Sequence, residues 1–239
     1  MSILARLRWA LTPAHTRLAQ INAVPAYERR NLERTLKGRA RYQPCFKRTQ
    51  SLFIHVPKAA GRSVVRGLYD VRSVEHASAQ WYQSLDADKY HRYFSFTIVR
   101  NPWDRLASAY SYLRQDGAAT NLDDSAWGGR MRSYASLDEF VCTWLTTSTA
   151  MEHILFTPQH LFVCNDSDEL DLDFVGRFET LEEDYKHIAM HVKGAGPLPH
   201  LNKSRSAAYP ALYSDASRKI VAEVYKRDIE IFGYEFNRG

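Results

Sequence analysis

The chain has 239 residues, 45% of them hydrophobic and 13% aromatic, which is enough to bury a sizeable core as one α/β domain. Its net charge of +5 is uneven, because residues 1–50 carry 11 Lys/Arg against 2 Asp/Glu while the other 189 residues carry 21 against 25. The mildly acidic remainder argues against a general nucleic-acid binder.

Cysteine content and hydropathy exclude two further classes. Cys45, Cys142 and Cys164 have no CxxC or Cys/His spacing, so we expect neither a disulfide framework nor a zinc site, and a reducing cytoplasm fits best. The chain has no run of about 18 apolar residues, and its start, MSILARLRWAL, lacks a long apolar region and a cleavage site. This predicts a soluble, cytoplasmic protein without a signal peptide or transmembrane segment.

Residues 1–50 are predicted to form a basic helical extension. An apolar stripe runs from Ile3 to Ile21 and is interrupted by Pro13, as in a short amphipathic helix. Packing against the domain or another subunit, including a second copy of the chain, is favoured over attachment to a membrane surface.

Two strand-to-helix units follow the extension. The run SLFIHVP, residues 51–57, predicts a strand that is followed by the loop KAAGRS and the helical stretch SVVRGLYD. The run YFSFTIVR, residues 93–100, predicts a second strand, and Pro102 opens a helix that continues to Arg114. Nearly continuous apolar strands that alternate with helices indicate an α/β domain with a parallel sheet over residues 51–239.

The downstream half predicts shorter elements. Residues 115–135 are rich in Gly, Asp, Ser and Asn, which predicts a mobile loop that could cover a substrate. Residues 161–164 and 172–178 are interpreted as short strands. The last helix is expected over about 216–232, with Gly233 as its stop.

The loop PKAAGRS is a candidate phosphate site. It places Lys58, Gly61 and Ser63 between a strand end and a helix start, where free backbone N–H groups and the helix dipole favour an anion. It is not a Walker A motif, because GxxxxGK[ST] occurs nowhere and this lysine precedes the glycine by three residues. Taken alone, such a loop is equally typical of an ordinary strand-to-helix turn.

A second candidate phosphate site lies in TIVRNPWDRLASAY. Arg100 is at the carboxyl end of the second strand, where open α/β sheets bind ligands, and Ser108 is about two turns into the next helix. The planar guanidinium suits a phosphate. The alternative is that Arg100 pairs with an acid such as Asp104 and that Ser108 only packs.

The segments FIHVPKAAGRS and FTIVRNPWDRLASAY resemble the 5′-phosphosulfate and 3′-phosphate signatures of Golgi-type carbohydrate sulfotransferases (sulfotransferase family 2) and their bacterial relatives. GRFETLEEDY, PHLNKS and LYSDASRKIVAEVYKRDIEIFGYEF resemble later blocks, so the resemblance covers about residues 51–236. It implies a P-loop-like three-layer fold with a central, mostly parallel sheet flanked by helices. It also implies an O-sulfotransferase that uses 3′-phosphoadenosine 5′-phosphosulfate (PAPS), releases the desulfated nucleotide PAP and acts on a hydroxyl, with a carbohydrate favoured.

The resemblance further implies which residues hold the donor. The 5′-phosphosulfate lies among Lys58, Ala59, Ala60, Gly61, Arg62 and Ser63, the 3′-phosphate on Arg100 and Ser108, and the nucleotide under Lys203 and Ser204. Ala59 and Arg62 stand where the family usually has threonines, so contacts of those hydroxyls are lost while backbone contacts remain. Arg62 either substitutes by its charge or alters the affinity.

In-line sulfuryl transfer needs charge stabilisation on the leaving phosphate and removal of the acceptor proton, and it requires no metal. Lys58 is the candidate for charge stabilisation. His76, between the two phosphate motifs, is the candidate general base, with a purely structural role equally weighted. His200 is the second choice and Glu179 the third, whereas His55 is expected to pack beneath the loop.

Other side chains could serve the acceptor. Trp81 and Trp127 could stack on a sugar, although a place in the core is favoured. Arg130 and Arg132 either contact an anionic acceptor or are solvated. Two alternatives to a sulfotransferase stay open: a kinase-like phosphotransferase, whose Walker or magnesium-binding elements we do not find, and a non-catalytic module that binds nucleotides or polyanions.

Overall fold

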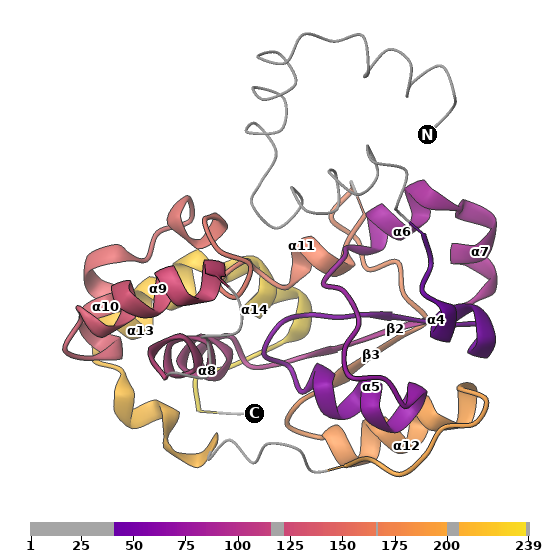
Figure 1. The fold of residues 1–239 in the computed structure, drawn as a ribbon. Coiled ribbons are helices and arrows are strands. Elements are labelled where there is room, and N and C mark those ends of the chain that lie inside the picture. The colour runs from indigo at the N-terminus through magenta and orange to yellow at the C-terminus, as the bar shows by residue number, and fades with distance from the viewer. Residues whose placement is uncertain (1–40, 116–121, 166, 200–205, 238–239) are drawn as a thin grey trace, which may run out of the picture.

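The computed structural model describes residues 41–115, 122–165, 167–199 and 206–237 (Figure 1). In chain order its elements are α4 (Pro44–Thr49), β1 (Ser51–Ile54), α5 (Gly61–Tyr69), α6 (Ala79–Leu85), α7 (Ala87–Arg92), β2 (Phe94–Val99), α8 (Pro102–Arg114), α9 (Leu122–Arg132), α10 (Leu137–Trp144), η2 (Thr149–Met151), α11 (His160–Val163), β3 (Phe174–Arg177), α12 (Leu181–His191), η3 (Ser206–Leu212), α13 (Asp215–Val224) and α14 (Lys226–Phe232). The stripe predicted from Ile3 to Ile21 lies outside the described residues. Within them, no helix is both long enough and apolar enough to cross a bilayer.

A parallel three-stranded sheet organises the fold, in the order β1-β2-β3. Ser51 is opposite Phe94 where β1 meets β2, and Val99 is opposite Arg177 where β2 meets β3. The residues of β1 and nearly all of β2 are buried, which is why both strands appear in the sequence as nearly continuous apolar runs. The expected α/β fold with a parallel sheet flanked by helices is confirmed.

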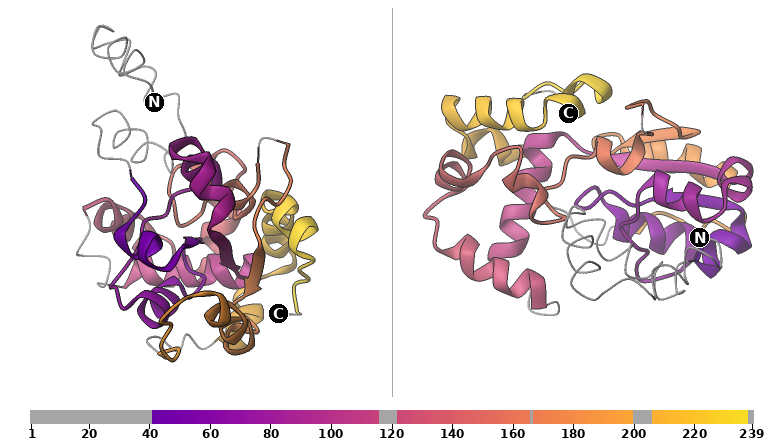
Figure 2. Two further views of the ribbon diagram at one scale, coloured as in Figure 1. Left: turned by 90° about the vertical axis from the view of Figure 1, so that its right-hand side faces the viewer. Right: turned by 90° about the horizontal axis from the view of Figure 1, so that it is seen from above.

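Helices cover both faces of the sheet. In Figure 1, α5 and α12 lie below the strands, and α6 and α11 lie above them. Buried side chains such as Phe53, Val65 and Phe96 fill these layers. A second core, which includes Leu106 and Phe140, joins α8, α9, α10 and α13 on the helical side of the molecule, seen from two further directions in Figure 2.

Two segments differ from the sequence-based expectation. Part of the loop predicted over 115–135 is helix α9, whose Gly128 lies so close to α8 that a Cβ atom there would be 2.9 Å from the Leu113 carbonyl oxygen. The strand predicted over 161–164 is helix α11 instead. Its start is stabilised by Asp228, a residue far along the chain, as described below.

The C-terminal helix is divided at Tyr225. The chain leaves helical geometry at that residue, whose hydroxyl donates a hydrogen bond of 2.7 Å to the Phe156 carbonyl oxygen. The end of the helix is as expected, because Gly233 adopts a left-handed conformation with φ 63°.

The packed core includes residues that precede β1. Tyr42 and Phe46 are buried in the sheet core, with exposures of 3% and 0%. The Tyr42 hydroxyl donates to the Tyr82 carbonyl oxygen at 3.0 Å, which ties the segment before α4 to α6. Chain from the extension predicted over 1–50 therefore contributes to the core.

Candidate active site

The loop between β1 and α5 has an unusual backbone. Lys58 and Ala60 have φ values of 66° and 60°, a left-handed region that residues other than glycine rarely adopt. Each such residue costs about 1–3 kcal/mol and persists only where its surroundings hold it. Turns of this kind direct successive backbone N–H groups to one side and form a concavity that binds anions. The loop is therefore suited to a phosphate or sulfate group.

Contacts from neighbouring elements hold the loop in this shape. Arg100, directly after β2, donates from Nη1 to the Lys58 carbonyl oxygen at 3.1 Å. The Ala60 carbonyl oxygen accepts from the Ser63 backbone N–H at 3.0 Å, within the first turn of α5, and Ala59 is fully buried. The two sequence motifs are therefore in direct contact through Arg100.

Position 61 must be a glycine because the imidazole ring of His55 lies directly against it. A Cβ atom at this position would lie 1.8 Å from His55 Nε2. The His55 side chain is only 5% exposed, and desolvation, with a smaller contribution from nearby His76, lowers its pKa well below the usual value. A neutral His55 therefore packs beneath the loop, in the position that the sequence analysis gave it.

His76 lies against His55, with ring centroids 3.9 Å apart. Its Nδ1 is 2.8 Å from the His55 carbonyl oxygen. Because a carbonyl oxygen only accepts, Nδ1 must carry the proton in this hydrogen bond, so in the neutral ring the lone pair is on Nε2. That tautomer is the one a general base needs.

Lys58 reaches from the loop to α8. Its Nζ lies 4.1 Å from the centre of the Tyr112 ring, a cation–π distance. Ser108 precedes Tyr112 by one helical turn and so shares its side of α8. Ser63 and Ser108 are both partly exposed. Lys58 therefore bridges the loop and α8, the helix that carries Ser108.

Arg100 makes the ion pair that the sequence analysis raised as an alternative. Its Nε lies 2.8 Å from Asp104 Oδ2, and the two side chains are only 3% and 7% exposed. The guanidinium also lies 3.9 Å from the centre of the Phe178 ring. Arg100 is therefore a fixed, largely neutralised cation at the strand end, and its contact with a 3′-phosphate stays a prediction.

Sequence reasoning missed the residues that hold Arg100 from behind. The Gln159 side-chain amide accepts from the Arg100 backbone N–H at 2.9 Å and donates to its carbonyl oxygen at 2.8 Å. The fully buried Asp228 carboxylate accepts from the backbone N–H groups of Gln159 and His160 at 2.7 and 2.8 Å. This network links α11 and α14 to the end of β2.

The remaining candidates have different settings. Arg62 is exposed on α5, and His200, Lys203 and Ser204 lie outside the described residues. Glu179 accepts hydrogen bonds from the Asn101 backbone N–H at 2.7 Å and the Tyr234 hydroxyl at 3.0 Å, so the third candidate base serves to join two segments.

The aromatic and arginine side chains considered for an acceptor are also placed. Trp81 is in the core at 7% exposure, as favoured from the sequence. Arg130 lies 4.9 Å from the Trp127 ring centre and 3.4 Å from a Glu152 carboxylate oxygen, whereas Arg132 is exposed. Trp127 therefore already has a cation on its ring.

Comparison with known proteins adds one finding to this geometry. The model of the sulfotransferase family matches residues 45–235, which is most of the chain. No curated protein and no solved structure matches it. The matched range contains the loop, the strand end at Arg100 and the segments that support them.

Proposed function

This chain belongs to the sulfotransferase family, and from that premise we propose that it transfers a sulfuryl group from PAPS to a hydroxyl of a carbohydrate. The observation that carries the proposal is the loop in which Lys58 and Ala60 adopt left-handed backbone conformations and Arg100 fixes the Lys58 carbonyl. Such a concavity of N–H groups at a helix start suits the 5′-phosphosulfate. Ala59 can still make these contacts, because they come from the backbone and not from the side chain.

Lys58 is proposed to stabilise the charge that develops on the leaving phosphate. Its ammonium lies on the Tyr112 ring, and the flexible four-carbon stem allows it to move to an oxygen of a nucleotide on the loop. Arg100 and Ser108 are proposed to contact the 3′-phosphate at the adjoining strand end. Arg100 is already held at the strand end by Asp104, so on this proposal only Lys58 has to move when the donor binds.

His76 is proposed to accept the acceptor's proton at Nε2. The S–O bond to the nucleotide phosphate breaks while a new S–O bond to the acceptor oxygen forms, and the products are PAP and a sulfate ester. The hydrogen bond from Nδ1 to the His55 carbonyl oxygen orients the ring and stabilises the imidazolium that forms.

A comparison of two lysine variants tests the proposal. Lys58→Ala is expected to lower kcat by about 10²–10³-fold, because one charge-stabilising group is lost. The control, Lys186→Ala, removes an exposed lysine of α12 and should leave kcat unchanged. Transfer of radiolabelled sulfate to cellular glycan fractions measures turnover, and calorimetry with PAP measures donor binding. Wild-type protein that neither binds PAP nor transfers the label would show that the proposal is wrong.

A further inference from the structure

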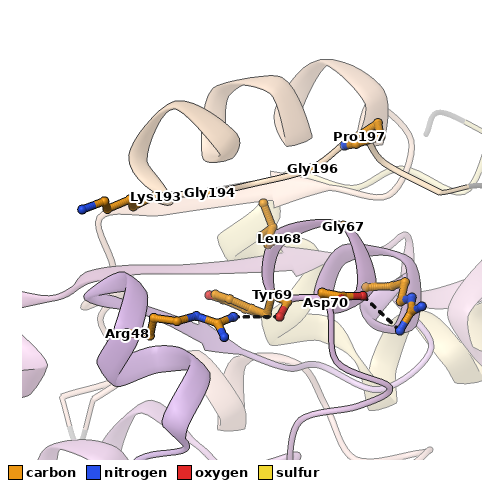
Figure 3. Close-up of a pocket in the computed structure, with 10 residues that line it drawn as sticks. Arg48, Gly67, Leu68, Tyr69, Asp70, Lys193, Gly194, Gly196 and Pro197 are labelled. Atoms are coloured by element: carbon orange, nitrogen blue, oxygen red, sulfur yellow. Dashed lines mark hydrogen bonds and ion pairs between the residues drawn. The ribbon is translucent and has the colours of Figure 1, made fainter.

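A hollow lies at the far end of α5 from the phosphate loop (Figure 3). Its volume is about 580 Å³, within the range of pockets that bind small ligands or parts of larger ones. It is formed between α4, the C-terminal end of α5 and the loop after α12, and is lined by Arg48, Arg66, Gly67, Leu68, Tyr69, Asp70, Lys193, Gly194, Gly196 and Pro197.

Close backbone contacts build this hollow before any ligand arrives. The Gly196 backbone N–H donates to the Gly67 carbonyl oxygen at 2.8 Å, and the Tyr185 hydroxyl donates to the Gly196 carbonyl oxygen at 2.8 Å. A Cβ atom on Gly67 would lie 2.2 Å from the Tyr185 hydroxyl. The wall formed by the loop after α12 is therefore fixed to α5, and a ligand need not order it.

Positive charge predominates in the lining, with Arg48, Arg66 and Lys193 against Asp70. Arg48 donates to the Tyr69 carbonyl oxygen at 3.0 Å, and the side chains of Arg48 and Lys193 lie on opposite walls of the hollow in Figure 3. The ion pair between Arg66 and Asp70 is exposed, with side-chain exposures of 50% and 85%. Exposed pairs of this kind contribute little, so Arg66 can exchange its partner for a ligand anion.

The positive charge continues from the hollow toward the phosphate loop. Arg62 and Arg66 are both exposed and are four residues apart on α5, so they share one side of the helix. Gly61 in the loop precedes Arg66, the first α5 residue that lines the hollow, by five residues, or about 7.5 Å along the helix axis. An extended anionic chain could contact both ends of α5 at once.

We propose that this hollow is an anion-binding exosite for an acidic carbohydrate acceptor, one that carries carboxylate or sulfate groups. The inference rests on the proposed function and names the class of acceptor. Arg48, Arg66 and Lys193 hold anionic groups of a sugar unit remote from the reacting hydroxyl, and Arg62 contacts the chain between the two sites. Binding energy from this remote part of the substrate would favour long acidic acceptors over short or neutral ones.

Chemical footprinting of the full chain tests the site directly. Lysine acetylation is followed by mass spectrometry with a size-defined sulfated dextran oligosaccharide, with neutral dextran of equal length, and with neither. We expect Lys193 to be acetylated several times more slowly with the sulfated probe alone, while Lys47 and Lys186, which do not line the hollow, react as before. Because the readout is specific to each lysine, binding to the basic N-terminal segment cannot imitate it. Equal protection of all three lysines, or none at Lys193, would overturn the proposal.

Charge reversal gives a second, independent measurement. Arg48→Glu combined with Lys193→Glu should weaken binding of the sulfated probe about 10-fold at low salt, since charge pairs near the surface are strongly salt-dependent. The matched control combines Lys47→Glu on α4 with Lys186→Glu on α12, the helix that precedes Lys193, and should have little effect. Because Arg48 also contacts the end of α5, Lys193→Glu is measured alone as well. Equal weakening in the pair and its control would show an effect of net charge and would overturn the proposal.

PAP binding separates failure of this inference from failure of the proposed function. Calorimetry with PAP should be unchanged by the reversals in the hollow. If wild-type protein binds PAP but the sulfated probe does not protect Lys193, the exosite is wrong and the proposed function stands. If Lys193 is protected but the protein neither binds PAP nor transfers sulfate, the proposed function is wrong, and so is the assignment of this anion as acceptor.

Discussion

His55 and His76 lie in contact but are suited to different tasks. His55 is enclosed beneath the loop, its pKa is lowered by burial, and its ring fills the space left by Gly61. His76 is only partly buried, and its hydrogen bond to the His55 carbonyl oxygen leaves Nε2 as the acceptor. We therefore assign loop support to His55 and propose proton transfer for His76.

Substitution of His76 by asparagine separates these roles. The asparagine amide can still donate to the His55 carbonyl oxygen but cannot accept a proton near neutral pH. We expect kcat to fall by about 10²–10⁴-fold, the usual contribution of a general base, with the Kd for PAP unchanged. Steady-state kinetics and PAP calorimetry measure the two effects. Normal kcat in this variant would move the base to another residue, with His200 the next candidate.

The buried imidazole of His55 makes stability depend on pH. Its pKa in the folded protein is well below the value of about 6.5 expected in the unfolded chain. As the pH falls below about 6.5, the unfolded chain therefore binds a proton that the folded protein does not, and the free energy of unfolding decreases by up to about 1.4 kcal/mol per pH unit. Urea unfolding at several pH values measures this slope.

His55→Gln is the control for that slope. Glutamine can still donate to the Val74 carbonyl oxygen, which His55 Nδ1 approaches at 3.3 Å, but it does not titrate. All other titrating groups are common to both proteins. Loss of stability on acidification should therefore be smaller in the variant, and identical slopes would show that His55 is not the group responsible.

At the scale of elements, local sequence signals predicted β1, α5, β2 and α8. The apolar runs of β1 and β2, and Pro102 at the start of α8, depend on residues near one another in the chain, and these elements formed as expected. Helices α6 and α7 were missed although Ser78 and Asp86 cap them locally, whereas α11 depends on a distant partner. Helix α11 replaces a predicted strand because Asp228 accepts the N–H groups at its start. The helix and strand propensities of residues 161–164 carry no information about a contact with Asp228.

The same distinction applies to the candidate site. Lys58, Gly61 and Arg100 could be found from the sequence, since each lies at a strand end or in the loop that follows one. Gln159 could not, because it reaches Arg100 across 59 residues of chain. No local sequence pattern indicates that the side chain of Gln159 binds the backbone N–H and carbonyl groups of Arg100.

Asp228→Asn tests the link between elements. The asparagine side chain keeps one accepting oxygen and replaces the other with an NH2 group, which only donates. One of the two backbone N–H groups therefore loses its acceptor, at a cost of about 1–3 kcal/mol. We expect lower stability in urea unfolding and weaker PAP binding, because Gln159 holds the Arg100 backbone less firmly. Asp215→Asn, at a side chain 87% exposed, is the control. Unchanged PAP affinity would show that the network does not support the donor site.

At the scale of the whole molecule, the residues directly before β1 are part of the packed core. Tyr42 and Phe46 precede β1 yet are buried in the sheet core, where their ring centroids lie 5.3 and 6.0 Å from that of Tyr82. Removal of one large buried aromatic side chain costs about 3–5 kcal/mol. Loss of both would cost about 6–10 kcal/mol, which is comparable to the entire stability of a typical domain, about 5–15 kcal/mol.

Truncated chains that begin at residues 41 and 51 test where the fold begins. The chain of residues 41–239 should unfold cooperatively in urea and bind PAP, because it keeps every described contact of α4. The chain of residues 51–239, which starts at the boundary predicted from charge, should lose near-UV circular dichroism and expose apolar surface, because Tyr42 and Phe46 no longer cover the core. Equal stability of the two chains would support the predicted boundary at residue 50. In that case the basic residues 1–50 would not be needed for the core. The burial of Tyr42 and Phe46 instead indicates that residues 41–50 contribute to it.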